Sequence, residues 1–228
     1  MQQHLAYGFN NTKAVVIPNG VDSKKFFPMA KEDARQQVGL PSESKIVVSV
    51  GHLTPNKGFD LLIKAMKELT EKPQDRPLLL VIVGGGAYVK ILEALIGSLQ
   101  LQSSVQLVGA VPHDQLLWYY NAADLVCLMS EKEGWPNVIL EALSCGRPML
   151  ASRAGGIPEI LTSPNVGHVI ERSVSQLVES MEQALQQDWN VPEIVAHAKM
   201  FDWTQTAQSV ETVLRSVVPQ QKVEYSHR

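Results

Sequence analysis

The chain has 228 residues, of which 45% are hydrophobic, so it can bury a sizeable core as one large domain or one domain with appendages. Its net charge of -3 and the lack of a long basic run exclude the electrostatic footprint of a nucleic-acid-binding protein. The longest apolar run, residues 77–83, is far shorter than the roughly 18 residues of a membrane-spanning helix, and the start MQQHLAYGFNN lacks the regions of a secretory signal. We therefore expect a soluble, cytoplasmic protein.

The first predicted elements lead to a candidate anion site. Residues 13–17 predict a short strand before a Pro-Asn-Gly turn, and residues 31–39 predict a short helix that ends at a glycine. Lys45–Gly51 is apolar throughout, as strands of parallel sheets are, and the amphipathic helix Phe59–Thr70 follows it. The loop between them carries Lys57 near the helix start, where a cation would face a bound anion, although a solvated loop lysine is the commoner explanation.

A second apolar run, residues 77–83, ends in Gly84, Gly85 and Gly86 before the predicted helix Tyr88–Leu99. These glycines lack the G-x-G-x-x-G spacing of a dinucleotide-binding turn. They indicate instead a tight turn with close helix packing.

The next unit is a third strand at residues 105–112, a helix at 113–121 and a fourth strand at 124–129. Trp118 and Tyr119 lie on the helix, where packing or a surface position explains them better than a stacking platform for a base. Two cysteines in apolar surroundings, without CxxC or His-Cys spacing, indicate buried free thiols and no metal site.

The stretch Ser130–Glu159 has glycines and prolines where a loop should open a helix after the fourth strand. Pro136 fits the first helical position, Asn137–Ser144 form the helix, and Gly146 can close it in the left-handed conformation. A strand followed by a loop and a helix is the setting of a ligand site in an α/β protein.

Two carboxylates frame the start of that helix: Glu133 in the loop and Glu141 one turn in. Carboxylates accept hydrogen bonds from sugar hydroxyls, whereas the free N–H groups and dipole of a helix N-terminus attract phosphate. The pattern therefore favours a sugar joined to a phosphate. Taken alone, two glutamates at this spacing are more often a solvated helix face.

The remaining elements are strands at residues 147–152 and 167–171 and helices at 174–187, 191–200 and 204–218. Strands that alternate with helices predict an α/β fold: a Rossmann-like, doubly wound parallel sheet of about six strands with helices on both faces. Ligands of such sheets bind outside the carboxyl ends of the strands, where the candidate residues cluster.

The pattern Glu-x7-Glu, followed by EALSCGRPMLAS and GGIPEIL, resembles the signature of the group 1 (family 4) glycosyltransferases, which are retaining nucleotide-sugar enzymes of the GT-B fold. VIPNGVD, VGHLTPNKG and the final helix are similar to other segments of that family. The resemblance implies an interdomain linker and first strand at 1–22, a donor-binding domain at 23–202, and a C-terminal crossing helix with a frayed tail at 203–228.

The resemblance also implies a role for each matching residue. Lys57 and Glu133 would be catalytic, with Lys57 on the pyrophosphate and Glu133 on the donor sugar. His52 stands where the family has a phosphate-binding arginine. In this set Glu141 would hold the ribose, Gly109 to Val111 would read the base, and the Asn137 and Val138 amides would face the phosphates. The full donor-binding set is His52, Lys57, Gly109, Val111, Glu133, Gly134, Trp135, Asn137, Val138 and Glu141.

By the same resemblance, the reaction transfers a sugar from a nucleoside-diphosphate sugar to an acceptor hydroxyl in glycan, polysaccharide or glycolipid synthesis, with retention and without a metal or other cofactor. A UDP-sugar is favoured and a GDP-sugar is the alternative. An N-terminal acceptor-binding half is expected as partner, and association with a membrane periphery would come through that half. A non-catalytic nucleotide-sugar-binding module and a sugar-nucleotide epimerase of GT-B architecture remain as alternatives.

Overall fold

The computed structural model describes residues 15–217, and the strands of this region form one parallel sheet in the order β3-β2-β1-β4-β5-β6. The order reverses between β1 and β4, which pair with each other at the centre of the sheet. The predicted doubly wound α/β fold is therefore confirmed. The strands are β1 (Lys45–Val50), β2 (Leu78–Val83), β3 (Val105–Gly109), β4 (Leu125–Leu128), β5 (Met149–Ser152) and β6 (Gly167–Ile170).

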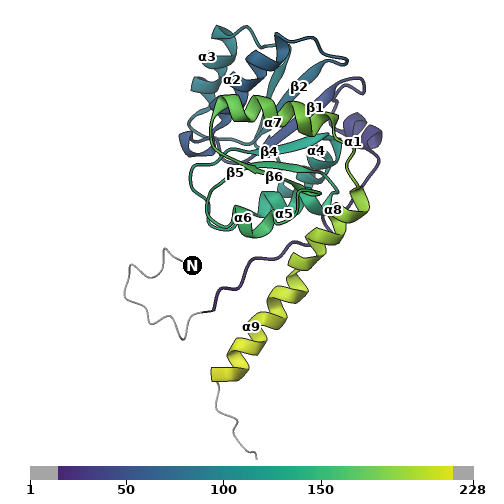
Figure 1. Cartoon of the computed structure of the whole chain (residues 1–228), viewed down its shortest axis with the longest axis vertical. Helices are drawn as coiled ribbons and strands as arrows, with labels where there is room; N and C mark the ends of the chain where they lie inside the picture. Colours follow the sequence, from purple (N-terminus) through teal and green to yellow (C-terminus); the bar gives the residue numbers. More distant parts are fainter. Residues whose placement is uncertain (1–14, 218–228) are drawn as a thin grey trace, which may run out of the picture.

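Helices cover both faces of the sheet (Figure 1). One face packs against α2 (Phe59–Thr70), α3 (Val89–Ser98) and α7 (Val174–Gln186). The other packs against α1 (Lys31–Gln37), α4 (Leu116–Ala122), α5 (Asn137–Ser144), α6 (Ile157–Ile160) and α8 (Val191–Ala198). Three short 3-10 helices, η3 (Pro55–Lys57), η4 (His113–Gln115) and η5 (Lys199–Phe201), and the C-terminal α9 (Trp203–Val217) complete the described elements.

The continuous apolar strands are explained by these two layers. Successive side chains of a strand point to opposite faces, so a strand that is covered on both sides has no position for a solvated residue. In β1, Ile46 and Val48 enter the core with α4 and α5, whereas Val47 enters the core with α2 and α7. All three are fully buried, and burial of such side chains stabilises a fold by about 1.5–3 kcal/mol each.

Some expectations about local structure were wrong. The strand predicted at 13–17 is irregular over residues 15–17, with Val15 and Val16 exposed, because no neighbouring strand pairs with it in the described region; residues 13 and 14 lie outside that region. The helix predicted at 113–121 is divided into η4 and α4. Helix α6 was not predicted, since it is only four residues long and has a proline in its first turn.

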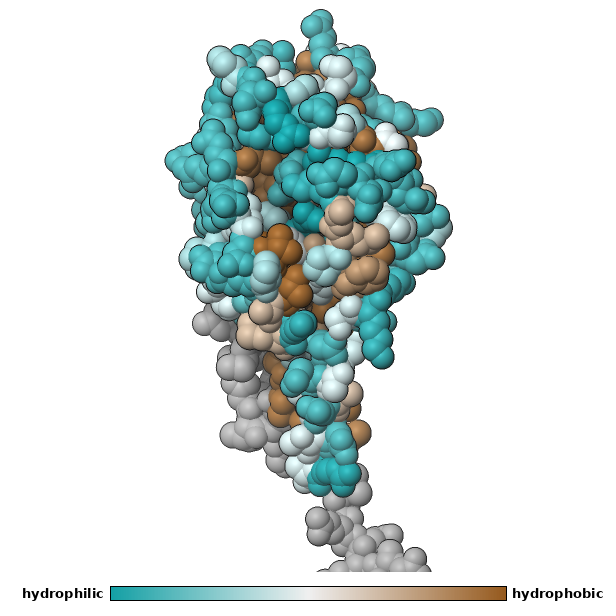
Figure 2. Space-filling model, turned by 90° about the vertical axis from the view of Figure 1, so that its right-hand side faces the viewer, coloured by the Kyte–Doolittle hydropathy of each residue, from teal (hydrophilic) through white to brown (hydrophobic). Residues whose placement is uncertain are grey.

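Helix α9 leaves the body of the domain and runs downward from it in Figure 1. Asp202 begins it, accepting from the Thr204 amide at 2.8 Å and from Ser23 Oγ at 2.8 Å. The hydrogen bonds from Thr204, and then the one from Ser23, lower the pKa of the Asp202 carboxyl. On the face shown in Figure 2, hydrophilic and hydrophobic residues lie side by side along this narrow part. Between residues 15 and 217, no helix combines the length and apolarity needed to cross a membrane.

Candidate functional site

The loops after β1 and β4 are fastened to each other at the point where the strand order reverses. The Glu131 amide donates to the Asn56 carbonyl at 2.8 Å, and Asn56 Nδ2 donates to the Lys132 carbonyl at 3.1 Å. Gly58 permits this approach, since a Cβ there would lie 2.2 Å from the Met129 carbonyl oxygen and its φ of 68° disfavours other residues. Crevices at such a reversal are the usual ligand sites of open α/β sheets.

This fastening brings Lys57 and Glu133 together although they are 76 residues apart. Lys57 Nζ donates to Glu133 Oε1 at 2.5 Å, with the side chains 24% and 11% exposed. At that burial the two charges are partly shielded from water and largely neutralise each other. The pair therefore offers one hydrogen-bonding group of each kind, a donor and an acceptor, to a ligand.

The predicted helix Asn137–Ser144 is confirmed as α5, and Gly146 closes it with φ of 70°. Pro136 was predicted as the first helical residue, and that prediction was wrong. It is the residue before the helix, with an extended ψ of 107°. Among residues 15–217, no side chain caps this N-terminus. The amides of Asn137 and Val138 therefore keep their hydrogen-bonding capacity for a bound group.

Glu141 is held by two donors. Tyr120 Oη donates to Glu141 Oε2 at 2.7 Å, and His113 Nε2 lies 2.8 Å from Glu141 Oε1. Burial, and then the negative charge of Glu141, raise the pKa of Tyr120 well above its ordinary value. Tyr120 thus stays protonated and keeps donating to the carboxylate.

These groups line one cleft of about 350 Å³. Its walls combine the Lys57–Glu133 pair, the start of α5, the Glu141 carboxylate and apolar side chains. The lining residues are Val50, Gly51, Lys57, His113, Leu116, Leu128, Glu133, Trp135, Pro136, Asn137, Val138 and Glu141. A cation, free amides and two carboxylates that converge in a partly apolar cleft suit a polar ligand that carries phosphate and hydroxyl groups.

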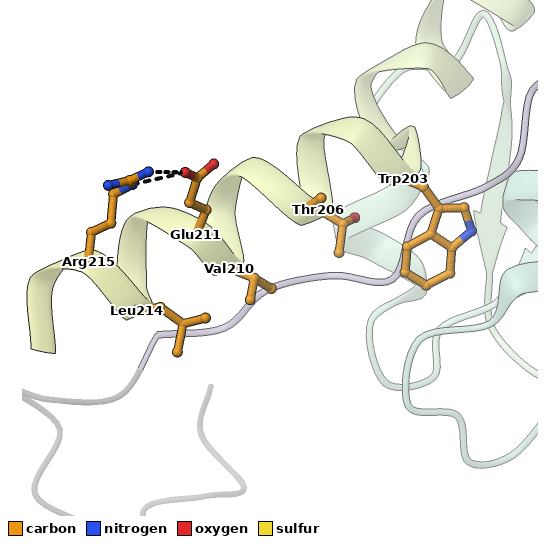
Figure 3. Close-up of a pocket in the computed structure, with 7 residues that line it drawn as sticks. Trp203, Thr206, Val210, Glu211, Leu214 and Arg215 are labelled. Carbon is orange, nitrogen blue, oxygen red and sulfur yellow. Dashed lines mark hydrogen bonds and ion pairs between the residues drawn. The ribbon is translucent and has the colours of Figure 1, made fainter. Parts of the chain in front are cut away.

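A larger hollow of about 570 Å³ lies along α9 and has a different character (Figure 3). Trp203, Val210 and Leu214 make it apolar, and its two charged side chains, Glu211 and Arg215, bond each other at 2.6 Å. No polar groups converge on its interior, so it resembles a packing surface more than a small-molecule site.

The structure gathers six of the residues proposed from the sequence in the cleft: Lys57, Glu133, Trp135, Asn137, Val138 and Glu141. The other four are not among its lining residues. His52 and Gly134 are exposed. Gly109 ends β3 with φ of 87°, and Val111 follows it. Both precede His113, which does reach the cleft.

Besides Gly58 and Tyr120, further residues outside the predicted set shape the site. His113 lines the cleft and faces Glu141. Gly155 and Gly156 support the loop of Glu133 from behind: a Cβ on Gly155 would lie 1.8 Å from the Glu133 carbonyl oxygen, and the Gly156 amide donates to the Gly134 carbonyl at 2.9 Å. The Gly-Gly dipeptide was a visible signal, whereas nothing in the sequence indicated that His113 meets Glu141.

Gly84 and Gly86 also have a role other than the expected helix packing. A Cβ on Gly84 would lie 1.9 Å from the Gly51 carbonyl oxygen, and one on Gly86 would lie 2.4 Å from the Leu53 carbonyl oxygen. The glycine turn after β2 thus packs on the backbone of the loop that carries Lys57. Trp118 and Tyr119 lie on α4, where Tyr119 is buried in the core and the partly buried Trp118 packs against it.

Comparison with known proteins places this site in a family. The sequence profile described as "Glycosyl transferases group 1" matches residues 30–200, which include every lining residue of the cleft. The chain belongs to the group 1 glycosyltransferases. The curated relatives include D-inositol 3-phosphate glycosyltransferases of Corynebacterium aurimucosum (31% identical over 91% of this chain and 52% of that protein) and of Kineococcus radiotolerans (34% identical over 71% and 39%). This glycosyltransferase chain spans about half the length of the curated relatives it matches.

Solved structures agree on the fold of this glycosyltransferase. HepE of Anabaena in complex with UDP superposes with a TM-score of 0.84 at 25% identity, over 95% of this chain and 61% of HepE. The C-terminal domain of a group 1 glycosyl transferase of Francisella tularensis is covered completely, over 89% of this chain, with a TM-score of 0.63 at 21% identity. The described fold is thus that of one half of a GT-B glycosyltransferase.

Proposed function

We propose that this chain binds the nucleoside-diphosphate sugar donor of a retaining glycosyltransferase, with a UDP-sugar favoured. The observation that carries the proposal is the cleft itself, in which the Lys57–Glu133 pair, the free amides of α5 and the Glu141 carboxylate face one space. HepE, 25% identical, has been solved with UDP-glucose, which supports a uridine nucleotide here.

Each lining group has a role in this proposal. The diphosphate lies at the start of α5, where the Asn137 and Val138 amides and the helix dipole stabilise negative charge. Lys57 contacts the same phosphates, and Glu133 accepts from hydroxyls of the transferred sugar. Glu141 accepts from the ribose hydroxyls.

In the proposed reaction, the bond from the anomeric carbon to the diphosphate oxygen breaks and a bond from that carbon to the acceptor oxygen forms on the same face. The acceptor proton passes to the departing phosphate. Oriented amides and the Lys57 ammonium stabilise the charge that develops on the leaving diphosphate. Donors that are already fixed in place are effective at this in a cleft shielded from water. With these donors in place the proposal needs no metal or other cofactor.

The acceptor belongs, in this proposal, to the half of the curated relatives that this chain does not match. The apolar stripe of α9, with Trp203, Val210 and Leu214 exposed, would pack against that half. Any contact with a membrane surface, and the acceptor's own binding site, would come from there as well.

Calorimetric titration of the chain with UDP, UDP-glucose, a GDP-sugar and NAD, each with and without EDTA, tests the proposal. We expect saturable binding of UDP and UDP-glucose, weaker binding of the GDP-sugar, none of NAD, and no effect of EDTA. Loss of UDP binding on chelation would contradict the metal-free role of Lys57. Binding of NAD in preference to UDP would contradict the proposed function.

A further inference from the structure

A chain of polar contacts connects Glu141 to the segment before α1. His113 Nε2 lies 2.8 Å from Glu141 Oε1, and its other ring nitrogen, Nδ1, lies 2.9 Å from Lys25 Nζ. Lys25 precedes residues 30–200, the part of the chain that the family profile matches. The family match therefore gives no role to Lys25.

The chemistry of these groups fixes which atom carries the proton. A lysine ammonium can only donate, so His113 Nδ1 must accept from Lys25. A neutral imidazole then carries its hydrogen on Nε2, where it donates to the Glu141 carboxylate. The Lys25 ammonium and the Glu141 carboxylate thus both require the tautomer of His113 that carries its proton on Nε2.

The number of acceptor positions on Glu141 fits the proposed ligand. A carboxylate has about four lone-pair positions. Tyr120 uses one on Oε2 and His113 uses one on Oε1, which leaves one on each oxygen of a side chain that lines the cleft. Two neighbouring hydroxyl groups of a ribose can donate to those two positions.

His113 needs an external group to hold its ring in place. Its side chain is 57% exposed, whereas that of Glu141 is 7% exposed. Besides Glu141 and Lys25, the ring meets Phe26 edge-on at 5.3 Å between ring centres. That contact packs against the ring but does not distinguish its two nitrogens, so the hydrogen bond from Lys25 to Nδ1 helps to set the direction in which Nε2 faces Glu141.

We infer that Lys25 and His113 form a positioning relay that orients the Glu141 carboxylate for the ribose hydroxyls of the bound nucleotide. This inference rests on the proposed function. It makes nucleotide affinity depend on the 21–28 segment, which meets the site through the Lys25–His113 contact and through the ring of Phe26.

The tautomer can be measured without a ligand. Imidazole ¹⁵N chemical shifts at about pH 8.5, where an ordinary histidine is neutral, should show the proton of His113 on Nε2 in the wild type. Lys25→Met keeps the aliphatic stem but removes the donor to Nδ1 and should change the Nδ1 shift, whereas Lys24→Met, a change at the exposed neighbouring residue, should leave the shifts unchanged. A wild-type His113 protonated on Nδ1 would overturn the relay.

Nucleotide titration then tests whether the relay matters. Lys25→Met and His113→Phe, which retains the ring against Phe26, should each weaken UDP binding by about threefold to tenfold, the size of one hydrogen bond. The double variant should lose no more than His113→Phe alone. 2′,3′-Dideoxy-UDP, which lacks the two hydroxyls, should bind all variants equally.

The outcomes separate this inference from the proposed function. If the wild type binds no UDP, the proposed function fails and the relay loses its purpose. If the wild type binds UDP and the variants bind it equally well or more tightly, only the relay is wrong. Equal losses for UDP and dideoxy-UDP would also overturn it, because the effect would then not pass through the ribose.

Discussion

Lys57 and Glu133 hydrogen-bond to each other, and this has consequences for any ligand that binds in the cleft. A diphosphate must share Lys57 with Glu133, whereas a sugar hydroxyl can share Glu133 with Lys57. Because Lys57 and Glu133 already contact each other at 2.5 Å, the diphosphate competes with Glu133 for Lys57, and the sugar hydroxyl competes with Lys57 for Glu133. Substitutions at the two positions should have opposite effects on UDP.

Replacing Lys57 by methionine should weaken UDP binding by about tenfold to hundredfold. The change removes a charged donor and leaves the Glu133 carboxylate unpaired beside the phosphates. Calorimetry on Lys57→Met gives the loss. Lys64→Met is the matched control, because Lys64 pairs with Asp60 one turn away on α2, outside the cleft. A Lys57 variant that binds UDP as well as this control would exclude Lys57 from the phosphates.

The two glutamates should respond differently to a ligand that lacks the sugar. Glu141→Ala should lose about tenfold to hundredfold in affinity for both UDP and UDP-glucose, as expected for a charged acceptor. Glu133→Ala should lose a similar factor for UDP-glucose only, and should bind UDP at least as tightly as wild type because Lys57 is released. Calorimetric titration of both variants with both ligands gives the pattern. Equal losses of Glu133→Ala on the two ligands would show that Glu133 does not contact the sugar.

At the scale of elements, the position of Glu133 depends on the close packing of its loop against Gly155. Gly155→Ala introduces a Cβ 1.8 Å from the Glu133 carbonyl oxygen at a φ of 50°, so the loop must move. We expect a loss of about 1–3 kcal/mol in the free energy of unfolding, together with a loss of UDP-glucose affinity.

Gly97→Ala is the control for that change. Gly97 lies in α3, and its Cβ would meet nothing closer than a Gln102 side-chain nitrogen at 4.0 Å. Alanine should therefore stabilise the helix by about 0.5–1 kcal/mol. Denaturant unfolding and titration of both variants give the comparison. A Gly155→Ala protein with unchanged stability and unchanged affinity would show that the packing does not position Glu133.

A second prediction at this scale concerns Asp124, which ties α1 to the central strands. It accepts from Lys31, from Arg35 at 2.7 Å and from the Ile46 amide at 2.6 Å. Burial raises the pKa of the Asp124 carboxyl, but the hydrogen bonds from Lys31 and Ile46 and the charges of Lys31 and Arg35 outweigh burial and lower it overall. A lowered folded pKa means that the stabilisation is present above the unfolded pKa of about 4 and is lost as the pH falls through the folded value.

Asp124→Asn should therefore cost about 3 kcal/mol of unfolding free energy at pH 7, because it leaves the buried Arg35 without its counter-charge. The difference from wild type should shrink below about pH 4. Urea unfolding across that pH range measures it, with Asp60→Asn, a change in the partly exposed pair with Lys64, as a control that alters stability little. A difference that is constant with pH would contradict a role for the carboxylate charge.

Local signals in the sequence were enough to predict most elements but not the contacts between them. Continuous apolar runs predicted the strands, Gly146 predicted the end of α5, and Pro136 marked its start to within one residue. The strand predicted at 13–17 failed because an apolar run forms a strand only where another strand is available to pair with it. The Lys57–Glu133 pair could be grouped only through a family resemblance, since the two residues lie 76 positions apart.

For the whole molecule, the proposal separates donor binding from transfer. The chain covers 52% of the Corynebacterium aurimucosum relative, and α9 carries an apolar stripe with Leu214 54% exposed. We expect the 228 residues to bind the donor without transferring sugar at rates of about 1 per second or more, which are typical of complete enzymes. Transfer at such rates by this chain alone, measured with radiolabelled UDP-glucose and a panel of acceptors, would contradict the assignment of the acceptor to the unmatched half.

The most direct test of the central claim is a crystal structure of this chain with UDP-glucose. The account predicts the diphosphate at the start of α5, within hydrogen-bonding distance of the Asn137 and Val138 amides and of Lys57 Nζ. The ribose hydroxyls should lie on Glu141 and the glucose hydroxyls on Glu133. A nucleotide bound outside the cleft between the β1 and β4 loops, or bound there with its glucose on Glu141 and its ribose away from it, would contradict the account.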